Sequence, residues 1–263
     1  MLPKKIHYCW FGGNELSDLA IKCIESWKQY CPDYEIIEWN ESNFDLECCD
    51  FVNEAYKAKK WAFVSDYARL KVIYDNGGIY LDTDVELIKS LDILLQEKCY
   101  FGEETTGYVA TGLGFGAEKH NPIINLLLKE YYNKHFINDD GSYNMDPCPK
   151  INTKPLLQFG YSFSGSKIWR CDDFTVYPPE YFCPLEYNTN KMIITSNTLS
   201  IHLYNASWLS TLDKLINRIE GNKKDNLFFK FRRVISFPFR FINKFKKNGF
   251  SNTIKQILNI IQR

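Results

Sequence analysis

Apolar and polar positions along residues 1–85 repeat with two different periods. Short apolar runs bounded by Gly, Pro or Asn predict strands, and longer runs with apolar residues three or four apart predict helices. Strands and helices that alternate in this way favour an α/β fold with a largely parallel sheet. The expected strands cover residues 5–10, 34–39 and 79–85, and helices are expected at 17–30, from about 51, and at 61–75.

The clearest of these helices, at 61–75, ends at a Gly pair that is typical of a helix C-terminus. It leads directly into the strand predicted at 79–85. Asp66 and Arg69 are three residues apart on it and share a face. They are either a surface ion pair or an acid and a phosphate donor beside the next strand. The apolar stripe that defines this helix consists of Phe63, Tyr67, Leu70 and Tyr74.

Two carboxylates, Asp82 and Asp84, stand one residue apart on the strand predicted at 79–85. Alternate side chains of an extended chain share a face, so the two should point the same way. Such a pair needs a cation, and Mg²⁺ or Mn²⁺ suits oxygen ligands. A bare Asp-x-Asp pair is also what chance supplies about once in such a composition. The pattern places Tyr80 on the carboxylate face and Ile79, Leu81, Thr83 and Val85 on the core face.

The second half of the chain has a weaker pattern. Residues 103–117 are rich in Gly and Thr, and we expect strands and turns that line a cleft. A helix is expected from Asn121 to Tyr132, and residues 138–175 are expected to be rich in loops. Residues 176–184 and 200–208 are expected to be extended. His202 lies in the second of these segments, and we expect it to be either a structural residue or a ligand.

The composition limits the classes of protein to which the chain can belong. A hydrophobic content of 45% is ample for a core, and the nine cysteines show no zinc-binding spacing. No signal-peptide pattern opens the sequence, and no apolar run has transmembrane length. We therefore expect a cytoplasmic protein with free thiols.

The net charge of zero hides a basic C-terminal segment. Residues 223–263 hold 11 Lys and Arg but a single acid, Asp225. We expect two parts, a catalytic domain at 1–212 and a basic, aromatic-rich helical extension at 213–263. The extension either packs on the body or binds an anionic membrane surface at the inner face of the plasma membrane. Nucleic-acid binding fits its charge but not the acidic body, and we expect none.

Five runs together resemble the DXD-containing glycosyltransferases of family thirty-two, over roughly residues 3–210. This family includes bacterial capsular polysaccharide and lipopolysaccharide sugar transferases. The chain is also distantly similar to the glucosyltransferase domain of large clostridial toxins. The order of the runs is more specific than any one motif. The runs are I-H-Y-C-W-F-G-G at 6–13, W-A-F-V-S-D-Y-A-R-L at 61–70, G-G-I-Y-L-D-T-D-V-E at 77–86, V-Y-P-P-E-Y-F-C-P at 176–184 and I-H-L-Y-N-A-S-W at 201–208.

The resemblance implies a GT-A fold with a Rossmann-like mixed sheet flanked by helices, and a retaining hexosyltransferase that uses a divalent metal, Mn²⁺ or Mg²⁺. It implies that Asp84 and Asp82 ligate the metal, with His202 as a metal or phosphate contact. The catalytic residues would be Asp82, Asp84 and Arg69. The donor-binding residues would be Trp10, which stacks on the nucleobase, together with Asp66, Arg69, Tyr80, Asp82, Ser207 and Trp208.

The expected reaction moves a hexose from a nucleotide-sugar donor, with a UDP-hexose favoured over GDP-mannose. The acceptor would be a glycan, such as a lipid-linked intermediate in capsular, exo- or lipopolysaccharide synthesis. Two alternatives stay open. One is a haloacid-dehalogenase-like phosphatase that uses Asp82 as nucleophile and Asp172-Asp173 as a late acidic pair. The other is a non-catalytic sugar- or lipid-binding module.

Overall fold

The computed structural model describes residues 1–163, 165–185, 191–205, 236, 239 and 242. Residues 1–205 form one compact unit, and 206–263 form a second. The predicted boundary between residues 212 and 213 and the basic segment 223–263 lie outside the described residues, so both stay predictions.

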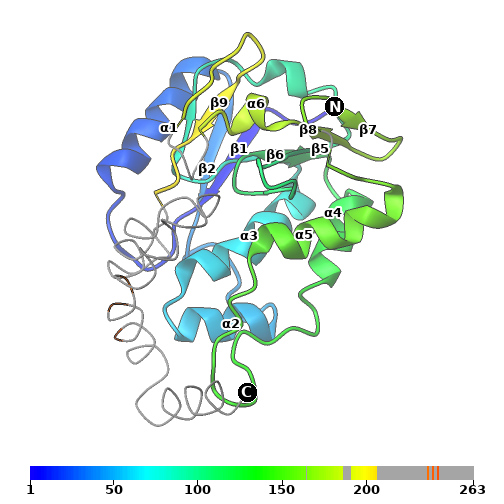
Figure 1. Ribbon diagram of the computed structural model, residues 1–263. Coiled ribbons are helices and arrows are strands. Elements are labelled where there is room, and N and C mark those ends of the chain that lie inside the picture. Colours follow the sequence, from blue (N-terminus) through cyan, green and yellow to red (C-terminus); the bar gives the residue numbers. More distant parts are fainter. Residues whose placement is uncertain (164, 186–190, 206–235, 237–238, 240–241, 243–263) are drawn as a thin grey trace. The chain divides into compact units, whose positions relative to one another are not determined.

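A seven-stranded mixed sheet forms the centre of the first unit, in the order β2-β1-β3-β6-β5-β8-β7 (Figure 1). β1 pairs in parallel with β2 and β3, and β5 pairs in parallel with β8, whereas β6 runs antiparallel between β3 and β5. The predicted α/β architecture is confirmed, but the sheet is parallel only in part. The strands are β1 (Lys5–Cys9), β2 (Glu35–Trp39), β3 (Gly78–Tyr80), β5 (Cys99–Gly102), β6 (Phe115–Ala117), β7 (Trp169–Arg170) and β8 (Thr175–Tyr177).

The direction of the strands decides where a ligand can bind. Because β6 is antiparallel to both neighbours, β3 and β5 run the same way, as do β1, β2 and β8. The carboxyl ends of these five strands therefore meet at one edge of the sheet, which we call the carboxyl edge. Ligands of open α/β sheets bind at this edge.

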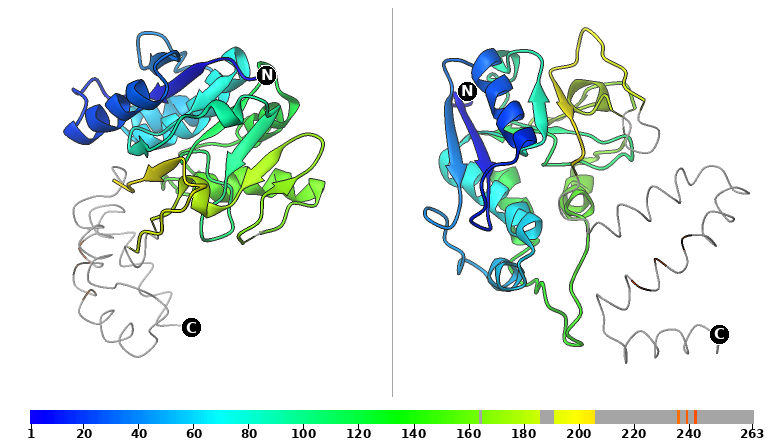
Figure 2. Two further views of the ribbon diagram at one scale, coloured as in Figure 1. Left: turned by 90° about the horizontal axis from the view of Figure 1, so that it is seen from above. Right: turned by 90° about the vertical axis from the view of Figure 1, so that its left-hand side faces the viewer.

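Helices cover both faces of the sheet, and each face has its own apolar core (Figures 1 and 2). One core contains residues of α2 to α5, and the other contains residues of α1 and α6. Ser17 caps α1 by accepting the backbone N–H of Ala20, as its position predicts. The helices are α1 (Asp18–Tyr30), α2 (Asp50–Lys57), α3 (Trp61–Asn76), α4 (Pro122–Lys129), α5 (Cys148–Leu156) and α6 (Pro179–Phe182).

The segment that carries the two carboxylates differs from the prediction. β3 ends at Tyr80, and a turn closed by the Val85 N–H on the Asp82 carbonyl passes the chain to β4 (Val85–Leu87). β4 pairs with β9 (Ser200–His202) in a separate two-stranded sheet. Thr83 lies in this turn and is half-buried, so its predicted place in the core is wrong.

Three predicted segments also need correction. Residues 138–175, expected to be rich in loops, also contain the helix α5, which the sequence did not reveal because Pro149 and Pro155 interrupt its pattern. Pro is tolerated in the first turn of a helix, which explains Pro149 there. The stretch 176–184 is extended only through β8 and then forms α6. The helix that begins at Pro122 ends at Lys129, earlier than expected. Among the described helices, none has the length and apolar character needed to cross a membrane.

Candidate active site

Asp82, Asp84 and His202 come together just beyond the carboxyl edge. Each offers one ligand atom, and these atoms lie within 4.8 Å of one another. The imidazole reaches this place because β9 pairs with β4, which sets His202 opposite Val85. Its Nε2 lies 3.2 Å from Oδ1 of Asp84, and its Nδ1 is buried without a hydrogen-bond partner among the described residues. Two carboxylates and one imidazole are a donor set that suits Mn²⁺, and the carboxylates alone suit Mg²⁺.

The backbone fixes Asp84 in this cluster. Its carbonyl accepts the N–H of Leu203 at 2.9 Å, and its Oδ2 accepts the N–H of Asn205 at 2.8 Å. Between them Tyr204 has a φ of 50°, a left-handed conformation that is costly for a bulky side chain. This conformation turns the Asn205 N–H onto the carboxylate. Burial opposes ionisation of Asp84, but the hydrogen bond and charge of His202 lower its pKa below the usual value.

Asp82 belongs to a network with Arg69 and Asp66. Arg69 Nη2 lies 3.2 Å from Oδ1 of each carboxylate, and the residue is only 5% exposed. Asp66 and Arg69 are therefore not a surface ion pair. Burial raises the pKa of Asp66 to about 6, and it also raises the pKa of Asp82, against the opposing charge of Arg69.

Tyr80 is the fourth member of the network formed by Asp66, Arg69 and Asp82. Its hydroxyl donates to Oδ1 of Asp82 at 3.0 Å, and the guanidinium of Arg69 lies over its ring at 5.2 Å. Tyr80 and Asp82 therefore point to the same side of the chain, as the alternation predicts. The ligand atoms of Asp82 and Asp84 also converge to within 4.8 Å, although Asp84 lies in the turn after β3 and contacts His202.

Gly112 is a site residue that the sequence did not reveal. Its carbonyl accepts the N–H of Asp82 at 3.3 Å. A Cβ atom at this position would lie 2.3 Å from Oδ2 of Asp82 and 3.1 Å from Nη1 of Arg69. Only Gly leaves room for that pair of side chains. The segment 103–117 was predicted to line a cleft, but nothing local singles out this Gly among its neighbours.

Trp10 follows β1 at the carboxyl edge and is half-buried. Its N–H donates to the Trp39 carbonyl at 2.8 Å, and its indole Nε1 donates to the Asn14 carbonyl at 2.8 Å. The structure thus places Trp10 at the expected edge of the sheet. Its stacking on the nucleobase stays a prediction. Ser207 and Trp208 lie outside the described residues.

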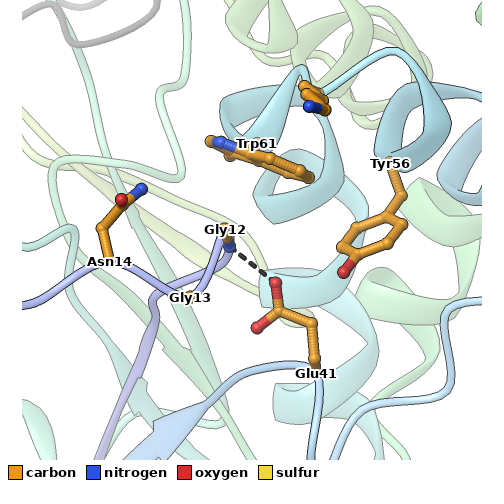
Figure 3. Close-up of a pocket in the computed structure, with 7 residues that line it drawn as sticks. Gly12, Gly13, Asn14, Glu41, Tyr56 and Trp61 are labelled. Atoms are coloured by element: carbon orange, nitrogen blue, oxygen red, sulfur yellow. Dashed lines mark hydrogen bonds between the residues drawn. The ribbon is translucent and has the colours of Figure 1, made fainter.

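A hollow of about 610 Å³ opens between the turn after β1 and the helices α2 and α3 (Figure 3). Glu41 Oε1 accepts the N–H of Gly12 at 2.6 Å, and the Trp61 indole lies so close to Gly12 that a Cβ there would be 2.7 Å from its Nε1. The ring of Tyr56 lies 5.1 Å from that of Trp61. The hollow therefore has an aromatic wall and a carboxylate. Its lining residues are Gly12, Gly13, Asn14, Glu41, Tyr56, Lys59 and Trp61.

One face of α3 connects this hollow to the carboxylates. Ser65 Oγ donates to the Trp61 carbonyl at 3.1 Å, and Arg69 Nε donates to the Ser65 carbonyl at 3.0 Å. Trp61 and Arg69 are eight residues apart, which is about 12 Å along a helix. Trp61 and Glu41 were not among the site residues predicted from the sequence. The Gly12-Gly13 turn after the first strand was the available signal for them.

The acidic pair that a phosphatase would need lies elsewhere. Asp172 and Asp173 are exposed in the turn that precedes β8. β8 runs parallel to β3, so the start of β8 is at the opposite edge of the sheet from Asp82. The two cannot act on one substrate with Asp82.

Similarity to known proteins extends over the segment that carries both carboxylates. Residues 17–101, which include both carboxylates, match the model of the "Glycosyltransferase sugar-binding region containing DXD motif". The chain is 23% identical over 252 residues to inositol phosphoceramide mannosyltransferase 1 of Schizosaccharomyces pombe, covering 90% of this chain and 72% of the relative. It is 22% identical over 220 residues to an uncharacterized glycosyltransferase of Acanthamoeba polyphaga mimivirus, covering 79% and 84%. The chain is a glycosyltransferase.

Other relatives of this glycosyltransferase are matched over a smaller part. Human lactosylceramide 4-alpha-galactosyltransferase is 24% identical over 156 residues, which cover 54% of this chain and 41% of the relative. Among solved structures, PaToxG glycosyltransferase aligns with a TM-score of 0.46 at 20% identity, covering 60% of this chain and 70% of that one. A glycosyltransferase involved in the glycosylation of the major capsid of PBCV-1 aligns with a TM-score of 0.43 at 14% identity, covering 77% of this chain and 94% of that one.

Proposed function

We propose that this glycosyltransferase is a retaining, metal-dependent enzyme that moves a hexose from a nucleotide-sugar donor to a glycan acceptor. The observation that carries the proposal is the cluster of Asp82, Asp84 and His202 next to the buried Arg69. A nucleoside diphosphate is the leaving group, so negative charge grows on phosphate oxygens as the bond to the sugar breaks. A divalent cation bound by these three residues would neutralise that charge.

The residues around the cluster have distinct roles in this proposal. Asp84 would ligate the cation directly, whereas Asp82, held by Arg69 and Tyr80, would contact both the cation and the ribose. Asp66 accepts hydrogen bonds from sugar hydroxyls, and Arg69 binds on the diphosphate side. Ser207 and Trp208 are proposed to contact the diphosphate. Neither Asp82 nor Asp84 acts as a nucleophile, so the acceptor hydroxyl attacks on the face from which the diphosphate leaves.

We favour a UDP-hexose as donor, with GDP-mannose as the second candidate. The aromatic faces of Trp10 and Trp61 support a nucleoside at the carboxyl edge, since stacking of a base is worth about 1–3 kcal/mol. Two of the relatives are named for ceramide lipids, which supports a lipid-linked acceptor. Such an acceptor is compatible with capsular, exo- or lipopolysaccharide synthesis, and with a cytoplasmic enzyme held at the inner face of the plasma membrane.

A panel of donors tests the function directly. Purified protein would be incubated with UDP- and GDP-hexoses and Mn²⁺, and release of nucleoside diphosphate would be measured with and without a chelator. We expect metal-dependent release from one donor. Release of phosphate from a monoester, with no nucleoside diphosphate from any sugar donor, would instead establish the phosphatase reading.

Substitutions of Trp10 and Trp61 distinguish between two candidate binding places for the nucleobase of the donor. If the base stacks on Trp10, Trp10→Ala should raise the donor KM about 10-fold while kcat changes little, because stacking acts on ground and transition states alike. Trp61→Ala should then leave the donor KM within about twofold. A large KM effect confined to Trp61→Ala would move the nucleoside into the hollow of Figure 3. The measurement is steady-state kinetics at saturating acceptor.

The basic segment 223–263 predicts that membrane binding can be removed while donor hydrolysis is kept. Deleting residues 223–263 should release the protein from vesicles that contain anionic lipid, because the Lys and Arg residues that attract such lipid are removed. Metal-dependent donor hydrolysis should persist. Co-sedimentation with neutral and anionic vesicles measures this, and unchanged binding of the truncated protein to anionic vesicles would refute the membrane role.

A further inference from the structure

A groove of about 300 Å³ lies between the turn after β5 and the C-terminal end of α5. Its walls include Tyr108, Leu157 and Phe163, whose side chains are 44%, 55% and 55% exposed. Phe163 packs so closely on Gly107 that a Cβ added there would lie 3.2 Å from its ring. Large apolar side chains that gather at one surface groove are typical of a binding surface. None of the roles proposed above uses them.

The turn that forms one wall of the groove leads back to the carboxylates. β5 ends at Gly102 at the carboxyl edge, and the N–H of Ala110 donates to the Gly102 carbonyl at 3.0 Å, so the chain doubles back beyond this edge. Four residues farther than Tyr108, the Gly112 carbonyl accepts the N–H of Asp82. Four residues span at most about 14 Å. The groove is therefore within reach of a long ligand whose other end lies at the carboxylates.

The helix α5 runs beside this returning segment and connects the same two places. Asn152 Nδ2 donates to Oγ1 of Thr111, at the site end of the segment, at 3.0 Å. Thr153 Oγ1 accepts the N–H of Val109 at 2.8 Å, and Leu157 lines the groove. Five residues separate Asn152 from Leu157, which is about 8 Å along a helix. The end of α5 therefore carries the groove away from the carboxylates in a known direction.

One stripe of α5 faces the groove, and its chemistry changes along the helix. Lys150, Lys154 and Leu157 all line the groove, and their spacings of four and three residues place them on one side of the helix. Lys150 pairs with Asp146 at 3.7 Å, and Lys154 pairs with Glu130 at 3.5 Å. Both lysine side chains are mostly exposed, so these pairs are weak, and an ammonium group has three N–H donors. Starting from the carboxylates, a ligand would meet two cations first and the apolar side chain after them.

We propose that this groove binds the acceptor, a glycolipid in which a phosphate joins the sugar to an alkyl chain. This inference rests on the proposed function and assigns a binding site to its acceptor. The sugar lies at the metal-binding cluster, and the phosphate contacts Lys150 and Lys154. The alkyl chain packs on Tyr108, Leu157 and Phe163. A neutral oligosaccharide would leave the apolar walls unused, and an uncharged alkyl glycoside would leave the lysines unused.

A series of synthetic acceptors tests the assignment on the full chain. The donor identified by the panel would be used with the methyl glycosides, the octyl glycosides and the octyl phosphodiesters of glucose, galactose and mannose, below the concentrations at which micelles form. We expect kcat/KM to rise at least about 10-fold from the methyl to the octyl compound, because apolar surface is buried. The phosphodiester should add at least about fivefold, because the lysines pair with its charge.

Substitutions on the stripe should remove these two preferences separately. Leu157→Ser should abolish most of the gain from the octyl chain, and the double variant Lys150→Gln/Lys154→Gln should abolish the gain from the phosphate. Release of nucleoside diphosphate without acceptor should stay within about twofold in both, since the proposed donor site is unchanged. The matched controls are Ile93→Ser, at an equally exposed apolar side chain, and Lys28→Gln, at an exposed lysine paired with a carboxylate on α1.

Equal kcat/KM for methyl and octyl acceptors would overturn the assignment, as would a chain-length preference that Leu157→Ser retains in full. A phosphate that gives no gain over the octyl glycoside would overturn the role of the two lysines. A second copy of the chain is the competing occupant, and a wild-type dimer that Leu157→Ser dissociates in sedimentation would also overturn the assignment. A wild-type protein that releases no nucleoside diphosphate from any donor would instead overturn the proposed function.

Discussion

Asp84→Asn is expected to lower kcat/KM for sugar transfer by about 10³-fold, which corresponds to about 4 kcal/mol. The amide keeps the shape of the carboxylate but removes its charge, so a cation would be held more weakly where the diphosphate leaves. The fold should survive, because Asn can still accept the backbone N–H of Asn205. Activity at increasing Mn²⁺ concentration and direct binding of Mn²⁺, followed by electron paramagnetic resonance, measure the effect.

The matched control for this variant is Asp75→Asn at the end of α3. Asp75 pairs with Lys71 on the surface and carries the same charge away from the cluster. We expect its activity and Mn²⁺ affinity to match those of the wild type. If Asp84→Asn binds Mn²⁺ and transfers sugar as well as this control, Asp84 is not a metal ligand.

The sequence predicted the elements around Asp82 because their signals are local. Ser17 and Gly77 mark the ends of α1 and α3, and both caps are present in the structure. The two carboxylates are neighbours in sequence, so one short motif reveals both. Their different surroundings were not predictable, since Asp82 meets Arg69 on α3 and Asp84 meets His202 on a strand more than a hundred residues away.

The second half of the sheet was harder to predict for a physical reason. β6 has three residues, Phe115–Ala117, with a Gly at its centre, so it shows neither a long apolar run nor β-branched residues. Its antiparallel pairing with β3 and β5 nevertheless decides that Gly112, which precedes β6, reaches the carboxyl edge. Contacts of this kind depend on pairing between distant segments, which a single sequence does not encode in any local pattern.

Gly112→Ala is expected to lower kcat/KM by about 100-fold although it adds one methyl group. That methyl would lie 2.3 Å from Oδ2 of Asp82, so the carboxylate must move and lose its contacts with Arg69 and Tyr80. A displacement of about 1 Å at a site of this kind costs on the order of 100-fold in rate. The free energy of unfolding should fall by about 1–3 kcal/mol, as expected for overpacking.

Gly141→Ala separates this effect from a general loss of stability. Gly141 has a φ of 77° in a loop where an added Cβ meets nothing within 4 Å, so alanine there introduces backbone strain without touching the site. Thermal unfolding should show a loss of stability in both variants, whereas only Gly112→Ala should lose activity and Mn²⁺ affinity. Full activity of Gly112→Ala would mean that the position of Asp82 tolerates a shift, and that the close fit around its carboxylate is not required for transfer.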